Sequence, residues 1–145
     1  MRILLLLSHL FLLTVTAYTQ NWQTDFDKAK EQATQENKPI VLVFQGSDWC
    51  APCMKLEKDI WNSKEFSDYA ITNFIMLKAD FPKKKANALD SKQQEHNNKL
   101  AETYNQSGYF PFVVVLNNTG KVLGTFGYKK IAPKEYINLI ESFKK

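Results

Sequence analysis

Two cysteines lie three positions apart in one turn of this chain, and they are the only cysteines among its 145 residues. Cys50 and Cys53 follow the apolar run 39–44 and open a segment with helical character. Thiols at this spacing share one face of a helix, which brings them close enough for a small, reversible disulfide. A bridge that closes so short a loop removes little entropy from the unfolded chain, so it adds little stability. The spacing therefore favours redox chemistry by thiol–disulfide exchange.

A metal site is the first alternative for such a cysteine pair. A closed structural zinc site needs about four Cys or His ligands. Outside the N-terminal segment, the chain offers only His96 in addition to the two cysteines. We therefore expect no metal and no other cofactor, and a pair of inert thiols remains the second alternative.

The N-terminal residues indicate export. Arg2 provides a positive start, residues 3–15 are mostly apolar, and small residues precede Ala17. This pattern predicts a signal peptide over 1–17, cleaved after Ala17, and a single mature domain over 18–145. The apolar run is shorter than the ~20 residues that span a bilayer, although an uncleaved anchor remains the alternative. We expect a periplasmic or secreted protein, in a compartment where disulfides persist.

The charge distribution gives no indication of a nucleic-acid partner. The formal net charge is +4, and Lys83-Lys84-Lys85 is the only dense basic cluster, without aromatic residues interleaved. This cluster is more typical of a solvated loop than of a nucleic-acid or membrane surface. We expect a monomer with no nucleic-acid partner and no stable membrane insertion once the signal peptide is removed.

Hydrophobic periodicity and turn residues predict an alternation of helices and strands. The fully apolar run 39–44 is typical of a central strand that is covered on both faces. Strands are expected at 39–44, 73–79, 111–116 and 121–126, with a hairpin turn at 117–120 and a loop at 81–89. Helices are expected at 22–36, 51–61, a short stretch through Ala70, 90–104 up to Gly108, and from Pro133 onward.

This order of elements around Trp49-Cys-Ala-Pro-Cys53 resembles the thioredoxin superfamily over essentially the whole mature chain. The segment Gly108-Tyr-Phe-Pro-Phe112 is similar to the cis-proline segment of that family. Residues 48–50 and 55–58 are also similar to small secreted thioredoxin-like proteins and to the C-terminal periplasmic domain of transmembrane thiol-disulfide interchange proteins. The resemblance implies an α/β thioredoxin fold. A central mixed sheet of about four strands would be flanked by helices, with the Cys-x-x-Cys turn at the N-terminus of the helix after the first core strand.

Each residue of the motif then has an expected role. The N-terminus of a helix favours a thiolate, so Cys50 should be the exposed nucleophile and Cys53 the buried thiol that resolves the mixed disulfide. Trp49 should pack beside the pair at the substrate-binding surface, which is compatible with ordinary core packing. The resemblance implies that Pro111 faces the cysteines and that the backbone of Phe110 pairs with an extended substrate.

Resolution of the mixed disulfide also needs a group that accepts the proton of Cys53. Thioredoxins use a buried aspartate six residues before the first cysteine, and this chain has Phe44 there. Glu57 is the candidate replacement, because it lies four residues after Cys53 on the same helical face. The alternative is a solvated glutamate paired with a lysine. Asp48, which lies close to Cys50, is expected to be a loop or capping residue.

Three functions fit these features. The first is a thiol-disulfide oxidoreductase that reduces protein disulfides, which needs a transmembrane electron donor to recharge it. The second is a disulfide oxidase or isomerase, and the third is a binding protein that uses the scaffold without catalysis. Ala51-Pro52 does not separate reductase from oxidase, because the potential depends on the relative stability of dithiol and disulfide. We favour the reductase, with protein thiols and disulfides as partners.

Overall fold

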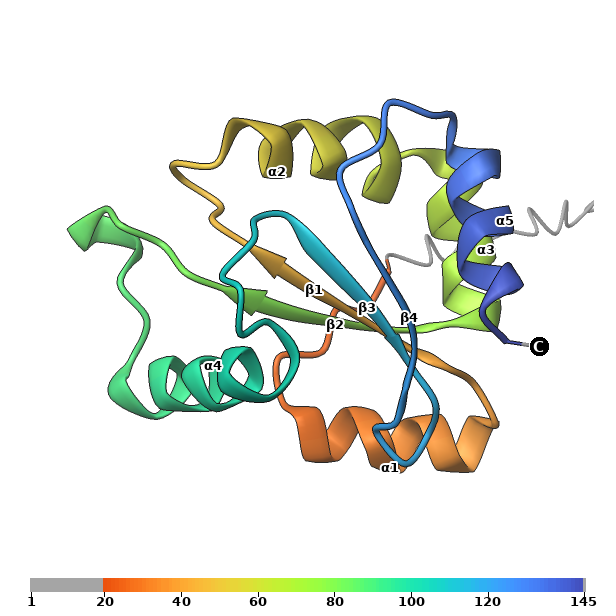
Figure 1. Ribbon diagram of the computed structural model, residues 1–145, viewed down its shortest axis with the longest axis horizontal. Helices are drawn as coiled ribbons and strands as arrows, with labels where there is room; N and C mark the ends of the chain where they lie inside the picture. The colour runs from red at the N-terminus through yellow and green to blue at the C-terminus, as the bar shows by residue number, and fades with distance from the viewer. Residues whose placement is uncertain (1–19, 145) are drawn as a thin grey trace, which may run out of the picture.

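The computed structural model describes residues 20–144. A four-stranded mixed sheet forms the centre of the protein (Figure 1). Its strand order is β2-β1-β3-β4. Strand β2 runs parallel to β1, whereas β3 is antiparallel to both β1 and β4. The strands are β1 (Ile40–Gln45), β2 (Ile75–Asp80), β3 (Phe112–Leu116) and β4 (Val122–Gly127). The mixed sheet expected from the sequence is confirmed, including the antiparallel hairpin of β3 and β4.

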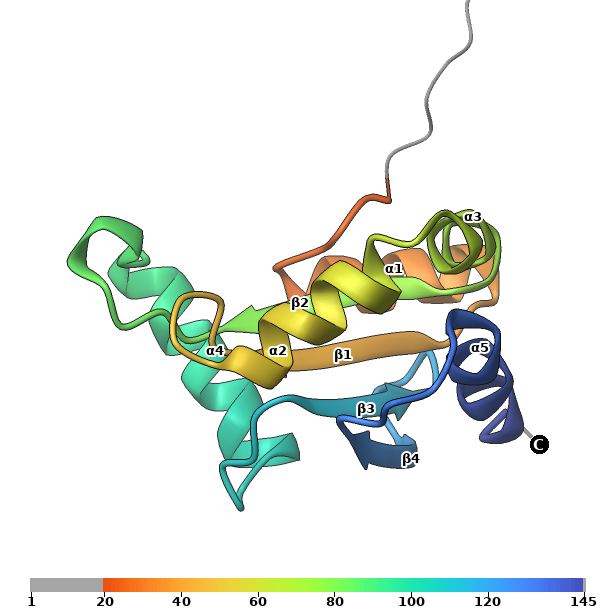
Figure 2. The same ribbon diagram turned by 90° about the horizontal axis from the view of Figure 1, so that it is seen from above.

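Helices cover both faces of this sheet, so the fold has three layers (Figures 1 and 2). One face carries α1 (Phe26–Glu36) and α4 (Ser91–Tyr104). The other face carries α2, the π-helical turn η1 that continues it, α3 and α5. Their bounds are α2 (Ala51–Leu56), η1 (Glu57–Trp61), α3 (Lys64–Asn73) and α5 (Pro133–Ser142), and a short 3-10 turn, η2 (Lys85–Asn87), precedes α4.

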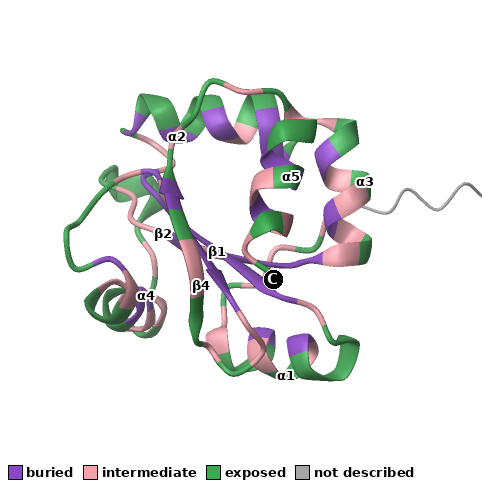
Figure 3. Cartoon of the chain, turned by 45° about the vertical axis from the view of Figure 1, so that its right-hand side comes forward, coloured by how far each residue is buried: buried purple, intermediate pink, exposed green. Residues whose placement is uncertain are grey.

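Strand β1 is buried along its whole length (Figure 3). Its side chains alternate between two apolar clusters, as the period of two in a strand requires. Val41 and Val43 belong to the cluster beneath α2, α3 and α5. Ile40, Leu42 and Phe44 belong to the cluster beneath α1 and α4. The continuous apolar run of the sequence is therefore explained by a central strand that faces two layers of helices.

Trp61 holds the far end of the helix that starts at the cysteines. Its side chain is 1% exposed, and its ring packs 4.7 Å from that of Phe66 in α3 and 5.8 Å from that of Tyr136 in α5. Burial of a large apolar side chain contributes about 1.5–3 kcal/mol, and edge-to-face aromatic pairs add to it. This packing fixes α2 and η1 against the sheet, and it thereby fixes the position of the turn at Cys50.

The first helix begins four residues later than the sequence indicates. Helix α1 starts at Phe26, after the N-cap Asp25, whose carboxylate accepts hydrogen bonds from the backbone N–H groups of Asp27 and Lys28. The N–H of Lys28 is the main cause that holds the pKa of Asp25 below its usual value. Trp22 lies outside the helix, and its ring meets that of Trp61 at 6.2 Å. The expected helix 22–36 is thus wrong at its start, because Trp22 reaches the core from extended chain.

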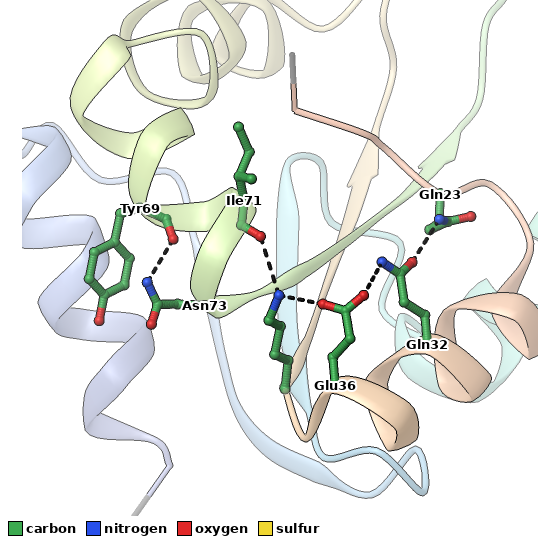
Figure 4. Close-up of polar contacts among 7 residues, drawn as sticks. Gln23, Gln32, Glu36, Tyr69, Ile71 and Asn73 are labelled. Carbon is green, nitrogen blue, oxygen red and sulfur yellow. Dashed lines mark hydrogen bonds and ion pairs between the residues drawn. The ribbon is translucent and has the colours of Figure 1, made fainter. Parts of the chain in front are cut away.

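A chain of polar side chains ties α1 to α3 across the edge of the sheet (Figure 4). The amide of Gln23 donates to Gln32 at 2.9 Å, and the amide of Gln32 donates to Glu36 at 2.8 Å. The ammonium of Lys38 bonds to the Glu36 carboxylate and, at 3.3 Å, to the carbonyl of Ile71 in α3. The Lys38 contact is the main reason that the pKa of Glu36 is lowered. These contacts, some exposed and some partly buried, link the two helices at this edge of the sheet.

The predicted signal peptide, residues 1–17, lies outside the described residues. From residue 20 to residue 144, no helix is long and apolar enough to cross a membrane.

Candidate active site

Cys50 and Cys53 lie at the start of α2, after the turn that follows β1. Cys50 is the N-cap of α2, and its sulfur accepts a hydrogen bond of 3.3 Å from the backbone N–H of Cys53. The two residues are joined by a disulfide, with their Cα atoms 5.2 Å apart. Pro52 occupies the first turn of the helix, where its missing N–H costs no hydrogen bond. The cysteine pair is thus at the N-terminus of the helix after the first core strand, as expected.

In this oxidised form Cys50 is not exposed. It is 5% exposed and Cys53 is 3% exposed. The reason is that the Cys50 sulfur turns toward the first turn of α2, where it meets both the sulfur and the N–H of Cys53. The expectation of an exposed Cys50 is therefore wrong for the disulfide. The same N–H, together with the dipole of α2, is positioned to stabilise a thiolate on Cys50 once the bond is reduced.

Trp49 forms one wall beside the cysteines. It is 37% exposed, and its indole N–H donates a hydrogen bond of 2.7 Å to the carbonyl of Phe81, which follows β2. Its ring meets that of Phe110 edge-on at 5.4 Å, and Phe81 meets Phe110 at 5.5 Å. A Cβ atom at Gly46 would lie 2.2 Å from the Trp49 ring, so only glycine fits there. Three segments that are distant in sequence therefore meet around one indole.

Pro111 is buried immediately before β3, and the Phe110–Pro111 peptide bond is cis. The next residue, Phe112, pairs in register with Phe44, so Pro111 lies at the sheet end from which β1 leads to the cysteines. Asn105, which is buried, fixes the preceding loop, because its side chain bonds to both the carbonyl and the N–H of Tyr109, at 2.9 and 3.1 Å. Asn105 is not among the residues expected from the sequence, since an asparagine after a helix carries no signal for such a contact.

Glu57 lies at the start of η1, and its carboxylate pairs with the ammonium of Lys78 in β2 at 3.2 Å. Both side chains are partly buried. Lys78 is the register partner of Val43 in β1, so the pair spans from the sheet to the cysteine-bearing helix. The Nζ atom of Lys78 also lies 4.7 Å from the centre of the Trp22 ring. The carboxylate is therefore held in one place by an ion pair inside the layer that contains Cys53.

The count of six residues back from Cys50 does not identify the residue of β1 that faces α2. Phe44 packs in the cluster beneath α1 and α4, on the opposite face of the sheet. Val43 packs in the cluster that contains Leu56 of α2. Because Val41 and Val43 are both apolar, β1 presents no carboxylate to the helix that carries the cysteines. Two carboxylates lie on that side of the sheet. One is Glu57, on the turn that continues α2, and the other is Asp80 at the end of β2, which accepts hydrogen bonds from the N–H and the hydroxyl of Ser47.

These residues together form a dithiol–disulfide pair with an aromatic wall on one side and Pro111 at the neighbouring strand end. Across residues 20–144, no three His, Cys, Asp or Glu side chains gather in a way that could hold a metal ion. The arrangement can transfer two electrons between the cysteine pair and a disulfide brought against it.

Residues 21–118 match a family model described as thioredoxin-like. The disulfide bond reductase DsbH of Chlamydia pneumoniae is 33% identical over 128 residues, which are 88% of this chain and 75% of that protein. A solved structure of a DsbH oxidoreductase has a TM-score of 0.80 and 32% identity, and covers 90% of this chain and 88% of that one. The oxidised C-terminal domain of DsbD from Neisseria meningitidis shares the fold, with a TM-score of 0.56 and 21% identity over 81% of this chain and 90% of that one.

Proposed function

The chain belongs to the thioredoxin-like family, and we propose that it is a thiol-disulfide oxidoreductase that reduces disulfides in exported proteins. The observation that carries the proposal is the Cys50–Cys53 disulfide at the N-terminus of α2. The reductive direction is supported by the 33% identical relative, which is named a disulfide bond reductase.

The reaction proceeds in two exchanges. In the reduced protein, the Cys50 thiolate attacks one sulfur of the substrate disulfide, and the other substrate sulfur leaves as a thiolate. The product is a mixed disulfide between Cys50 and the substrate. Cys53 then loses its proton and attacks the Cys50 sulfur, which releases the second substrate thiolate. Two electrons have passed to the substrate, and the protein ends in the disulfide form described above.

The substrate lies against the wall formed by Trp49, Phe110 and Pro111. An extended chain pairs with the backbone of Phe110 and lies across the cysteine turn, as in strand addition. This role is supported by the ring contacts that hold Phe110 against Trp49 and by the hydrogen bonds from Asn105 that fix the preceding residue.

Glu57 accepts the proton of Cys53 during resolution. Its position four residues after Cys53 supports this role, since residues at that spacing lie one above the other on a helix. The ion pair with Lys78 adds support, because it holds the carboxylate on the sheet side of the helix. Lys78 is then a positioning residue for Glu57.

The protein works as a monomer in the periplasm or outside the cell, after removal of residues 1–17. In such an oxidising compartment each turnover leaves the pair oxidised, so a membrane-bound electron donor must return it to the dithiol. The proposed location rests on the positive start and apolar run of the N-terminal segment.

The proposed function is tested by catalysed reduction of a protein disulfide. We expect the mature protein at micromolar concentration to accelerate the reduction of insulin by a small dithiol, in proportion to protein concentration. The matched control is protein that is reduced and then alkylated at its cysteines before the assay. A rate equal to that of the dithiol alone, with and without alkylation, would overturn the proposal.

A further inference from the structure

Three consecutive lysines lie beside the active site, in the segment between β2 and α4. We call residues 82–87 the lysine loop, since it contains Lys83, Lys84 and Lys85. Strands β1 and β2 are parallel and end together, with Gln45 opposite Asp80. The turn that leads to Cys50 and the lysine loop therefore leave the sheet at the same end, and they lie side by side in Figures 1 and 2.

Asp48, two residues before Cys50, binds the lysine loop through hydrogen bonds. Its carboxylate accepts hydrogen bonds from the backbone N–H groups of Lys83 at 2.9 Å and Lys84 at 3.0 Å, and from the side-chain amide of Asn87 at 2.9 Å. The bond from Lys83 is the main cause that holds the pKa of Asp48 below its usual value. Since the carboxylate is occupied by backbone groups, the lysine side chains extend from a fixed base.

Lys83 also contacts the wall of the active site directly. Its Nζ atom lies 4.0 Å from the centre of the Trp49 ring, which is within the distance of a cation–π interaction. Trp49 is the residue before Cys50 and contacts Phe110. One ammonium group is therefore held at the surface against which we place the substrate.

In the part of the chain that the structure describes, no ion pair neutralises the ammonium groups of the lysine loop. All three lysines are exposed, and within residues 20–144 none of them has a carboxylate oxygen within 4.0 Å of its ammonium. By contrast, the Nζ atom of Lys55 in α2 lies 3.9 Å from a carboxylate oxygen of Asp59 in η1. The carboxylates nearby, those of Asp48, Asp80 and Asp90, are hydrogen-bonded to N–H and hydroxyl groups, so the three ammonium groups form an exposed positive rim without an ion-pair partner among the described residues. Such a field acts over about 8–10 Å at moderate ionic strength.

We propose that the lysine loop selects substrates that carry acidic residues beside the disulfide to be reduced. The inference rests on the proposed reductase function and names its substrate class, namely proteins with Asp- or Glu-rich sequence flanking the target cysteines. Fixed positive charge at the rim raises the rate of encounter with such segments and orients them. The loop takes no part in the exchange of electrons, and it acts on association.

The experiment compares three disulfide-linked peptides that differ only in the residues that flank their cysteines, which are glutamates, serines or lysines. The value of kcat/KM is measured for each peptide with the full mature protein at low and high salt. We expect the glutamate peptide to exceed the serine peptide by about tenfold at low ionic strength, with the lysine peptide slowest. The preference should shrink toward unity as salt screens the rim.

Two charge-matched triple variants locate the effect. One replaces the lysines of the loop by serine, and the other replaces three exposed lysines elsewhere, Lys28, Lys121 and Lys134. The readout is the ratio of kcat/KM for the glutamate and serine peptides within each variant, so a change common to both peptides cancels. We expect the ratio to fall to about one in the loop variant and to keep its wild-type value in the control.

Equal rates for the glutamate and serine peptides with the wild-type protein would overturn the inference. An equal loss of preference in the two triple variants would also overturn it, because net charge and not the loop would then be responsible. Both results leave the reductase function intact, since all peptides are still reduced. If the protein reduces none of the three peptides, the proposed function fails, and this inference fails with it.

Discussion

Replacement of Cys50 by serine will abolish catalysed disulfide reduction, with a loss on the order of 10³-fold or more relative to wild type. The Cys50 sulfur lies at the N-terminus of α2, where it meets the N–H of Cys53. A hydroxyl in its place is not ionised at neutral pH and does not attack a disulfide. The measurement is the initial rate of reduction of a model protein disulfide, and the folded state of the variant is checked by its thermal unfolding.

Cys53→Ser is the matched variant, and its expected result is different. Attack by Cys50 still occurs, but nothing resolves the product, so a mixed disulfide with the substrate accumulates. Mass spectrometry under non-reducing conditions should show one substrate molecule attached to Cys50. If both variants retain full activity, the protein does not act by thiol–disulfide exchange, and a binding role for the scaffold would replace the proposed function.

Glu57→Gln should slow resolution of the mixed disulfide by about 10²-fold, the lower end of the usual range for general base catalysis. The amide keeps the size of the side chain and removes the group that accepts the proton of Cys53. The first step, attack by Cys50, should be nearly unchanged. Rapid mixing with a disulfide that reports each step separately gives both rates.

The control for this variant is Asp59→Asn, which removes an exposed acid from the same turn, η1. We expect it to leave the resolution rate at its wild-type value. A change below about twofold would identify Glu57 as a surface charge paired with Lys78. A fall confined to the attack step would indicate a field effect on Cys50.

Much of the fold is predictable because its signals are local. The apolar run at β1 is long enough to indicate a strand buried on both faces, and the structure buries all six of its residues. Asn117 to Gly120 predicts the hairpin between β3 and β4, which the register confirms. The start of α1 was not predictable from periodicity, because Trp22 reaches the core from extended chain and Asp25 sets the first turn.

The candidate site was predictable only where its residues adjoin one another in sequence. The Cys-x-x-Cys turn is recognisable from the sequence alone. The hydrogen-bond partners of Trp49 and Asp48, by contrast, lie more than thirty residues away, at Phe81 and Lys83. No local pattern encodes these contacts, since they depend on parallel strands ending together. Phe44, six residues before Cys50, does not face α2 for a related reason. The face of the sheet on which a side chain of β1 lies is set by the alternation along that strand, and not by the number of residues that separate it from Cys50.

The reduction potential of the Cys50–Cys53 pair decides whether the protein gives electrons to disulfides or takes them from thiols. It is measured by equilibrating the mature protein with dithiol or glutathione buffers of known potential and trapping the thiols. We predict a reducing value of about −270 mV, the potential of thioredoxin. A value of about −120 mV, typical of a strong disulfide oxidant, would contradict the assignment as a reductase.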